Sequence, residues 1–159
     1  NTVVLVAKNC LPQDREMNER NVYGDTGGWS KCKMRSYLND KFYELLPDDF
    51  QSIIIPRTIT QKIGDTEYSS EDKLWLPSQT EMFADYAEEI DAGDKHFPLY
   101  STNKSRTKIR INGSNTLWYW LRTPHSGNGS SVRPVYPTGT LNNSNALNSS
   151  GVAPACVIG

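Results

Sequence analysis

The end of the chain constrains the fold most, because a polar tract there runs directly into an apolar strand. Residues 139–150 read GTLNNSNALNSS, which has the composition of a loose tail, yet GVAPACVIG follows at 151–159 and is typical of a buried strand. The segment LWYWLRT at 117–123 is also strand-like. Since strands hold the tract at both ends, we expect it to be an ordered surface.

The same segment has an unusual composition. Lys, Glu, Gln, Met and Trp occur 28 times in residues 1–120 and never in residues 121–159, where the earlier rate predicts about nine. A disordered, solvated tail is usually rich in Lys and Glu. These five types are also the ones that an AAC codon cannot reach when both of its adenines are replaced, so mutagenesis directed at adenines explains the gap. A polar linker that lacks the five types by bias alone is the alternative, and composition does not decide between them.

The remaining composition is that of one globular domain. With 159 residues and 36% hydrophobic residues, the chain can bury a full core, and its net charge of −1 argues against a nucleic-acid binder. No apolar run reaches the length of a membrane span, and no signal peptide is visible. The chain begins NTVVLVAKNC without an initiator Met, which suggests a fragment. Its three cysteines lack CxxC spacing, so we expect buried free thiols.

Hydrophobic periodicity predicts an α+β domain with two helices packed on small antiparallel sheets. Apolar residues at helical spacing predict a helix over Ser30–Leu46, which Pro47 ends, and a Ser78/Glu81 capping box begins a second helix over Ser78–Ala87. The carboxylates of GDTEYSSED and EEIDAGD, within 65–94, are expected on solvated loops. Strands are expected at 2–7, 51–59 with a break or edge at Pro56, 74–76, 117–123, 132–139 and 152–158, and a loop at 14–28.

Four separated motifs resemble a family of C-type-lectin-like domains common in gut bacteria and their phages. They are GGWSKCKMRSYLNDKFYELLP, KLWLPSQTEMFADY, WYWLRTP and GVAPACVI, in that order, and the resemblance covers the chain from about residue 3 to the end. It implies a single C-type lectin-like domain over 1–159. Family members usually begin with one or two further strands, so the resemblance implies that the first strands are missing or that the chain belongs to a larger protein. Arg35 and Arg122 lie in these motifs beside aromatic residues, and we expect them to hold structural hydrogen bonds or ion pairs.

Many members of that family are variable proteins of diversity-generating retroelements, in which a reverse transcriptase rewrites adenine positions near the end of the gene. The resemblance implies a variable ligand-binding region at about 124–150, with Val132, Val135, Leu141 and Ala146 as inward anchors. It implies a receptor or adhesin that binds a selected protein or glycan ligand, with no catalytic role, cofactor, metal, nucleic acid or membrane insertion, at a cell or virion surface. The expected ligand-binding residues are His125, Ser130, Ser131, Arg133, Tyr136, Thr138, Thr140, Asn142, Asn143, Asn145, Leu147 and Asn148.

Three alternatives to this function concern a carbohydrate-binding module, an oxidase and a metal site. A fixed carbohydrate-binding module would stack sugars on Trp118 or Tyr136 and stays open as an alternative. Formylglycine-generating enzymes share the lectin fold but use closely placed cysteines near the C-terminus, where this chain has only Cys156. A metal site is disfavoured because His96 and His125 lack ligand spacing and no Glu-Pro-Asn, Gln-Pro-Asp or Trp-Asn-Asp triplet occurs.

Overall fold

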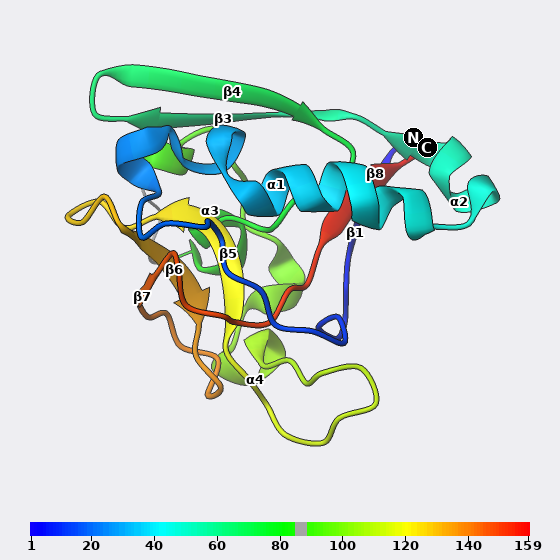
Figure 1. Cartoon of the computed structure of the whole chain (residues 1–159). Coiled ribbons are helices and arrows are strands. Elements are labelled where there is room, and N and C mark those ends of the chain that lie inside the picture. The colour runs from blue at the N-terminus through cyan, green and yellow to red at the C-terminus, as the bar shows by residue number, and fades with distance from the viewer. Residues whose placement is uncertain (85–88) are drawn as a thin grey trace.

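The computed structural model describes residues 1–84 and 89–159 (Figure 1). Its strands form three small antiparallel sheets, interspersed with short helices, so the predicted α+β class is confirmed. The sheets have the strand orders β1-β8-β2, β3-β4 and β5-β6-β7. The strands are β1 (Val3–Val6), β2 (Ile54–Ile55), β3 (Arg57–Ile63), β4 (Thr66–Asp72), β5 (Tyr119–Pro124), β6 (Ser131–Val135), β7 (Ser144–Asn145) and β8 (Ala155–Ile158).

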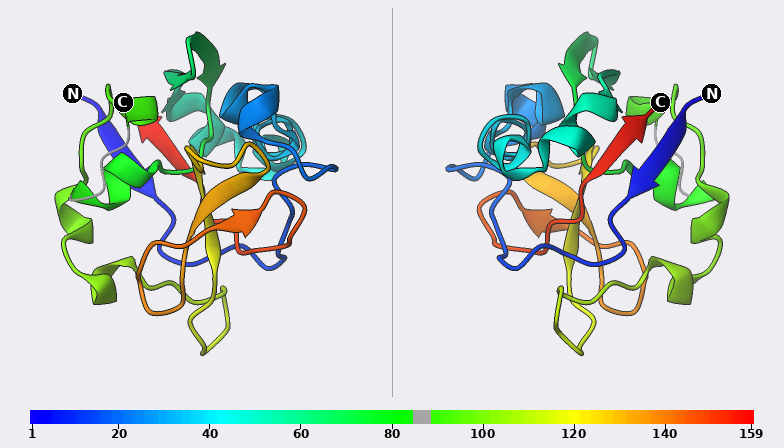
Figure 2. Two further views of the ribbon diagram at one scale, coloured as in Figure 1. Left: turned by 90° about the vertical axis from the view of Figure 1, so that its left-hand side faces the viewer. Right: turned by 90° about the vertical axis from the view of Figure 1, so that its right-hand side faces the viewer.

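The first and last strands lie side by side, which brings the two ends of the chain together (Figure 2). Val3 of β1 is opposite Ile158 of β8, and Val6 is opposite Ala155. Strands were predicted at 2–7 and 152–158, and both are confirmed with shorter bounds. The apolar end of the chain is therefore the central strand of a sheet, and the tract before it cannot hang free.

The first predicted helix is present but neither uniform nor complete. A 3-10 turn covers Gly28–Lys31, an α-helix α1 covers Lys33–Tyr37, and a π-helical turn follows at Leu38–Phe42, with a last 3-10 turn at Tyr43–Leu45. The α-helix begins after an extended Cys32, whose Sγ accepts a hydrogen bond from the Arg35 N–H at 3.4 Å. The predicted start of the helix at Ser30 was wrong, because Ser30 belongs to the 3-10 turn that precedes α1. That turn holds Trp29, whose indole is buried in the core and donates from Nε1 to Asp72 at 2.9 Å.

The second predicted helix is shorter than expected. The capping box is confirmed, since Ser78 N–H donates to Glu81 Oε2 at 2.8 Å and Glu81 N–H donates to Ser78 Oγ at 3.1 Å. The helix itself, α3, covers only Gln79–Met82. Residues 85–87 of the predicted helix lie outside the described residues. Short helical segments that the periodicity did not predict follow at Glu89–Asp91, Pro98–Tyr100 and α4 (Asn103–Arg106).

The predicted strand 51–59 was wrong in its first part. Residues Asp48–Ile53 form a helix, α2, that follows Pro47 and has two aspartates in its first turn, an arrangement that favours a helix start. Strand β2 begins only at Ile54, and Pro56 separates it from β3 as expected. The strand predicted at 74–76 is reduced to one bridge between Trp75 and Ala155.

The assignment of GDTEYSSED to a solvated loop was also wrong. These residues include β4, which pairs along its whole length with β3 from Arg57↔Asp72 to Ile63↔Thr66. Gly64 makes the turn with φ of 61°, a left-handed conformation that glycine adopts readily. The hairpin faces solvent with most of its side chains and buries few, chiefly Ile59, Gln61 and Asp72, so its apolar signal is weak.

The core consists of two clusters on opposite sides of β5. Trp120 belongs to the cluster that contains Trp29, Trp75 and Val152, whereas its neighbours Tyr119 and Leu121 belong to the other. This follows from the alternation of side chains along a strand. All six residues of β5 are buried, so the strand that leads into the polar tract is fixed from both sides.

Candidate binding surface

The segment that joins β5 to β8 leaves the core, crosses the surface and returns. Its inward residues match the predicted anchors: Val132, Val135 and Ala146 have no exposed surface, and Leu141 packs against the core while partly exposed. Strand β6 pairs with β5 across a register shift between Trp120 and Pro124, and β7 pairs with β6, with Ser131 opposite Asn145. The tract is therefore an ordered part of a sheet and its connecting loops.

The predicted ligand-binding residues differ in exposure. Tyr136 exposes 37% and Leu147 51% of their surface, and His125, Ser130 and Arg133 are partly exposed. The others that lie exposed are Thr138, Thr140, Asn142, Asn143, Asn145 and Asn148. Ser131 is a correction, because it exposes only 6%. It begins β6, the middle strand of its sheet, where it pairs with Asn145 of β7.

Main-chain hydrogen bonds shape the tract. Tyr136 N–H donates to the Thr140 carbonyl at 2.7 Å and closes a turn, and Ala146 N–H donates to the Ser130 carbonyl at 2.9 Å. Gly139 completes the turn with φ of 84°, and a Cβ atom there would lie 1.8 Å from the Asn103 carbonyl oxygen. Exposed side chains can thus change without removing these bonds, whereas Gly139 cannot be replaced without strain.

A hollow of about 660 Å³ lies beside this segment, and we call it the Asn/Ser hollow. Trp118 forms part of its wall and is partly exposed, and its ring meets the Tyr136 ring edge-to-face with 4.6 Å between centroids. Trp118 precedes β5 and lies outside both core clusters, whereas Tyr119 and Trp120 are buried on opposite sides of that strand. The lining residues are Trp118, Ser131, Asn143, Ser144, Asn145, Asn148, Ser149 and Ser150.

His125 lies apart from that hollow. It lines a separate cavity of about 320 Å³ with Asp25, Lys62 and Pro124, between the β3–β4 turn and the loop after β5. Its Nδ1 accepts a hydrogen bond from the Gly127 N–H at 2.9 Å. The structure therefore gathers several of the predicted asparagines with buried Ser131 at one hollow and places the predicted histidine at another.

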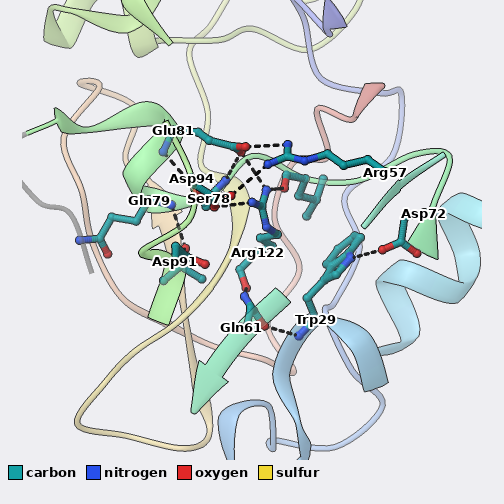
Figure 3. Close-up of polar contacts among 12 residues, drawn as sticks. Trp29, Arg57, Gln61, Asp72, Ser78, Gln79, Glu81, Asp91, Asp94 and Arg122 are labelled. Carbon is teal, nitrogen blue, oxygen red and sulfur yellow. Dashed lines mark hydrogen bonds and ion pairs between the residues drawn. The ribbon is translucent and has the colours of Figure 1, made fainter. Parts of the chain in front are cut away.

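Beneath the start of the segment lies a buried network of charged side chains (Figure 3). Arg122 donates to Glu81 at 2.8 Å, to Asp94 at 2.5 Å and to the Leu76 carbonyl at 2.7 Å. Arg57 pairs with the same two carboxylates, at 2.7 and 3.0 Å. Arg122 thus has a structural role, as predicted. Arg35 does too, since it pairs with buried Asp72 at 2.5 Å.

Burial and charge act in opposite directions on the ionisation of this network. Burial alone would lower the pKa of Arg122, but the negative charges of Glu81, Asp94 and Asp91 outweigh it and raise that pKa. Burial would raise the pKa of Glu81, yet the charges of Arg122 and Arg57 leave it below its usual value. Both groups are therefore held charged inside the protein.

Asp91 has a different environment. Burial raises its pKa to about 6, although the charge of Arg122 and a hydrogen bond from Thr123 oppose the shift. One carboxylate oxygen accepts the bond from the Thr123 hydroxyl, and the other has no hydrogen-bond partner among the described residues. The expectation that the carboxylates of 65–94 are solvated was thus wrong for Asp72, Asp91 and Asp94, because arginines and hydroxyls of distant segments surround them. Sequence patterning could not have found these contacts.

The other reactive groups are buried. All three cysteines are free and buried as predicted, and burial raises the pKa of Cys156. Within residues 1–84 and 89–159, no group of three His, Cys, Asp or Glu side chains is arranged to hold a metal ion. None of the helices in that part of the chain has the length and apolar character needed to span a bilayer.

Comparison with known proteins assigns the chain to a family without assigning it an activity. The family described as a domain of unknown function (DUF6273) matches residues 1–159, so the chain belongs to that family. No curated protein and no solved structure matched the chain.

Proposed function

We propose that this protein is a C-type-lectin-like ligand-binding domain whose surface between β5 and β8 is diversified by retroelement adenine mutagenesis. In this proposal it acts as a receptor or adhesin for a protein or glycan on a cell or virion surface, and has no catalytic role. The observation that carries the proposal is the separation of two kinds of position within one segment. Anchors such as Val132 and Ala146 are fully buried, while six residues between them are exposed, namely Tyr136, Thr138, Thr140, Asn142, Asn143 and Asn145.

Two further features support it. The tract keeps its shape through main-chain bonds and Gly139, so its exposed side chains are free to vary. Its Asn, Ser, Thr and Tyr side chains are also typical of paratopes, where Tyr provides rigid contact area and Ser and Asn adapt their hydrogen bonds. Tyr136 and Arg133 are the expected energetic centres, since aromatic and guanidinium groups dominate binding hot spots.

A library experiment tests the proposal directly. One displayed library randomises eight exposed positions, and a matched library randomises Val132, Val135, Ala146 and Val152 in the same segment. We expect most clones of the first library to remain protease-resistant and to yield binders against unrelated protein targets, and most clones of the second to be degraded. The eight positions are Tyr136, Thr138, Thr140, Asn142, Asn143, Asn145, Leu147 and Asn148.

The genomic origin has its own test. The DNA that flanks the gene should contain a near-copy of the sequence for residues 120–158 that differs only where the copy has adenine. A protease-sensitive first library, or a flank without such a copy, would contradict the diversified surface.

A further inference from the structure

We propose that the Asn/Ser hollow binds a neutral saccharide, with the Trp118 ring against the apolar face of a sugar and the Ser131 and Ser150 hydroxyls bonded to sugar hydroxyls. This inference rests on the proposed function only in taking this surface as ligand-binding. It adds the chemical class of the ligand and the residues that recognise it.

The hydroxyl groups of two largely buried serines point to a ligand in this hollow. Ser131 exposes 6% and Ser150 5% of its surface, and both line the hollow. Their backbone groups are bonded, but neither side-chain hydroxyl has a hydrogen-bond partner in the part of the chain that the structure describes. Neither oxygen is among the solvent-sealed polar atoms of the described residues, and both residues line the hollow. A hydroxyl without a protein partner takes its hydrogen bonds from water or from a ligand, so both are available to a molecule in the hollow.

The lining explains why the ligand should be neutral. All eight lining side chains are uncharged, so nothing in the wall pairs with a carboxylate, phosphate or ammonium group. Amides and hydroxyls both donate and accept hydrogen bonds, which matches the hydroxyl groups of a sugar. The volume of about 660 Å³ lies within the range of small-molecule sites, roughly 300–1,000 Å³.

Internal bonds hold the rim amides in place. Asn148 Nδ2 donates to Ser144 Oγ at 3.0 Å, which leaves its Oδ1 available to a ligand. Asn143 Oδ1 accepts from Arg133, which leaves its Nδ2 available. Asn148 thus presents an acceptor oxygen and is held through its NH₂ group, whereas Asn143 presents a donor NH₂ group and is held through its oxygen. Such fixed groups lose little conformational entropy when a ligand binds.

Trp118 supplies the apolar contact. Its ring is partly exposed and is braced by the edge-to-face contact with Tyr136. Aromatic rings provide large apolar contact area, and the CH groups on one face of a pyranose can lie against such a ring. A protein ligand is the competing occupant, but it would engage the protruding Tyr136 and Leu147 rather than require two hydroxyls at the base of a hollow.

The test is a titration of the whole domain with maltotriose, cellotriose, chitotriose and mannotriose, each in EDTA. Tryptophan fluorescence and saturation-transfer NMR report binding at concentrations up to about 10 mM, a range that suits weak single-site affinities. We expect at least one trisaccharide to bind saturably. Ser131→Ala and Ser150→Ala should each weaken its binding about fivefold, the equivalent of one neutral hydrogen bond. Trp118→Ala should weaken it at least about tenfold, and Trp118→Phe should restore part of the loss.

Ser114→Ala is the matched control, because Ser114 is exposed and does not line the hollow. Its binding should equal that of the unmodified domain, and circular dichroism of every variant should be unchanged. The inference is overturned if no trisaccharide binds, if binding requires calcium, or if both serine variants bind as well as the Ser114→Ala control.

The outcomes separate the two proposals. Protein binders from the surface library together with no saccharide binding would leave the proposed function standing and refute the saccharide. Saccharide binding that depends on Ser131 and Ser150, together with a protease-sensitive library, would support the hollow and refute diversification.

Discussion

Replacing Asp91 with Asn should shift stability in favour of the variant, relative to the unmodified protein, as the pH rises from 4 to 7. Asp91 exposes 1% of its surface, and burial raises its pKa from 3.8 to about 6. A carboxyl group with a raised folded-state pKa binds its proton more tightly in the folded than in the unfolded protein. Between about pH 4 and 6 the folded state therefore holds more protons, and stability falls as the pH rises.

A rise of the Asp91 pKa from 3.8 to about 6 corresponds to about 3 kcal/mol of stability lost between acid and neutral pH. Asn has no such titration and can still accept the Thr123 hydroxyl bond. Its amide also places an N–H where the carboxylate oxygen lacks a partner, which adds a cost that does not depend on pH. The pH-dependent part of the difference between variant and unmodified protein is thus the quantity to measure.

Urea unfolding at several pH values from 4 to 8 provides that difference. Asp91→Asn should gain about 2–3 kcal/mol relative to the unmodified protein on going from pH 4 to pH 7. Contributions from Glu81 and other carboxylates cancel in the comparison, since both proteins retain them. A difference in unfolding free energy that stays constant across this range would refute the assignment of a buried, raised-pKa carboxyl to Asp91.

Four further outcomes follow from the structure. Arg122→Met should lower the free energy of unfolding in urea by about 3–5 kcal/mol, because it leaves buried carboxylates without their main partner. The control Arg20→Met, on the surface, should change it by less than about 0.5 kcal/mol. Equal effects of the two variants would contradict a structural role for the Arg122 network. Trp120→Ala should cost about 3–5 kcal/mol. Joint replacement of Tyr136, Thr138, Thr140 and Asn142 should shift the unfolding free energy by about 1 kcal/mol or less, and a loss as large as that of Trp120→Ala would count against a surface that tolerates change. Chelator should leave the melting temperature unchanged, and a calcium-dependent rise would reveal a metal site.

Apolar pattern predicted those parts of the fold in which burial repeats along the sequence. Strands β1 and β8 are apolar runs and β5 begins with one at 119–121, and the Ser78/Glu81 capping box is a local signal read from four residues. The anchors of the polar tract were predictable for the same reason, since isolated Val and Ala residues in an Asn/Ser-rich segment have only the core to face.

Pairing between distant segments could not be predicted in this way. Strand β4 was predicted to be a loop because its residues are polar and form no apolar face. Its strand conformation comes from backbone pairing with β3 along its whole length. In the sequence, Asp91 and Asp94 have the pattern of surface carboxylates. Only the fold shows that Thr123 donates to Asp91 and Arg122 donates to Asp94. Ser131 was expected to be exposed from its type and its position between apolar anchors, but it lies in the middle strand of a sheet that forms from distant segments and is buried.

The surface tract also depends on residues far from it in sequence. Met17 N–H donates to the Ala146 carbonyl at 2.9 Å, and buried Arg106 donates from Nε to the Gly139 carbonyl at 3.0 Å. Both acceptors are main-chain atoms, so these contacts fix the path of the tract whatever side chains it carries. Replacing Arg106 should therefore alter ligand binding without touching the surface itself, because it removes the support of the Tyr136–Thr140 turn. The path of the tract is thus set in part by Met17 and Arg106, two buried residues that lie outside it.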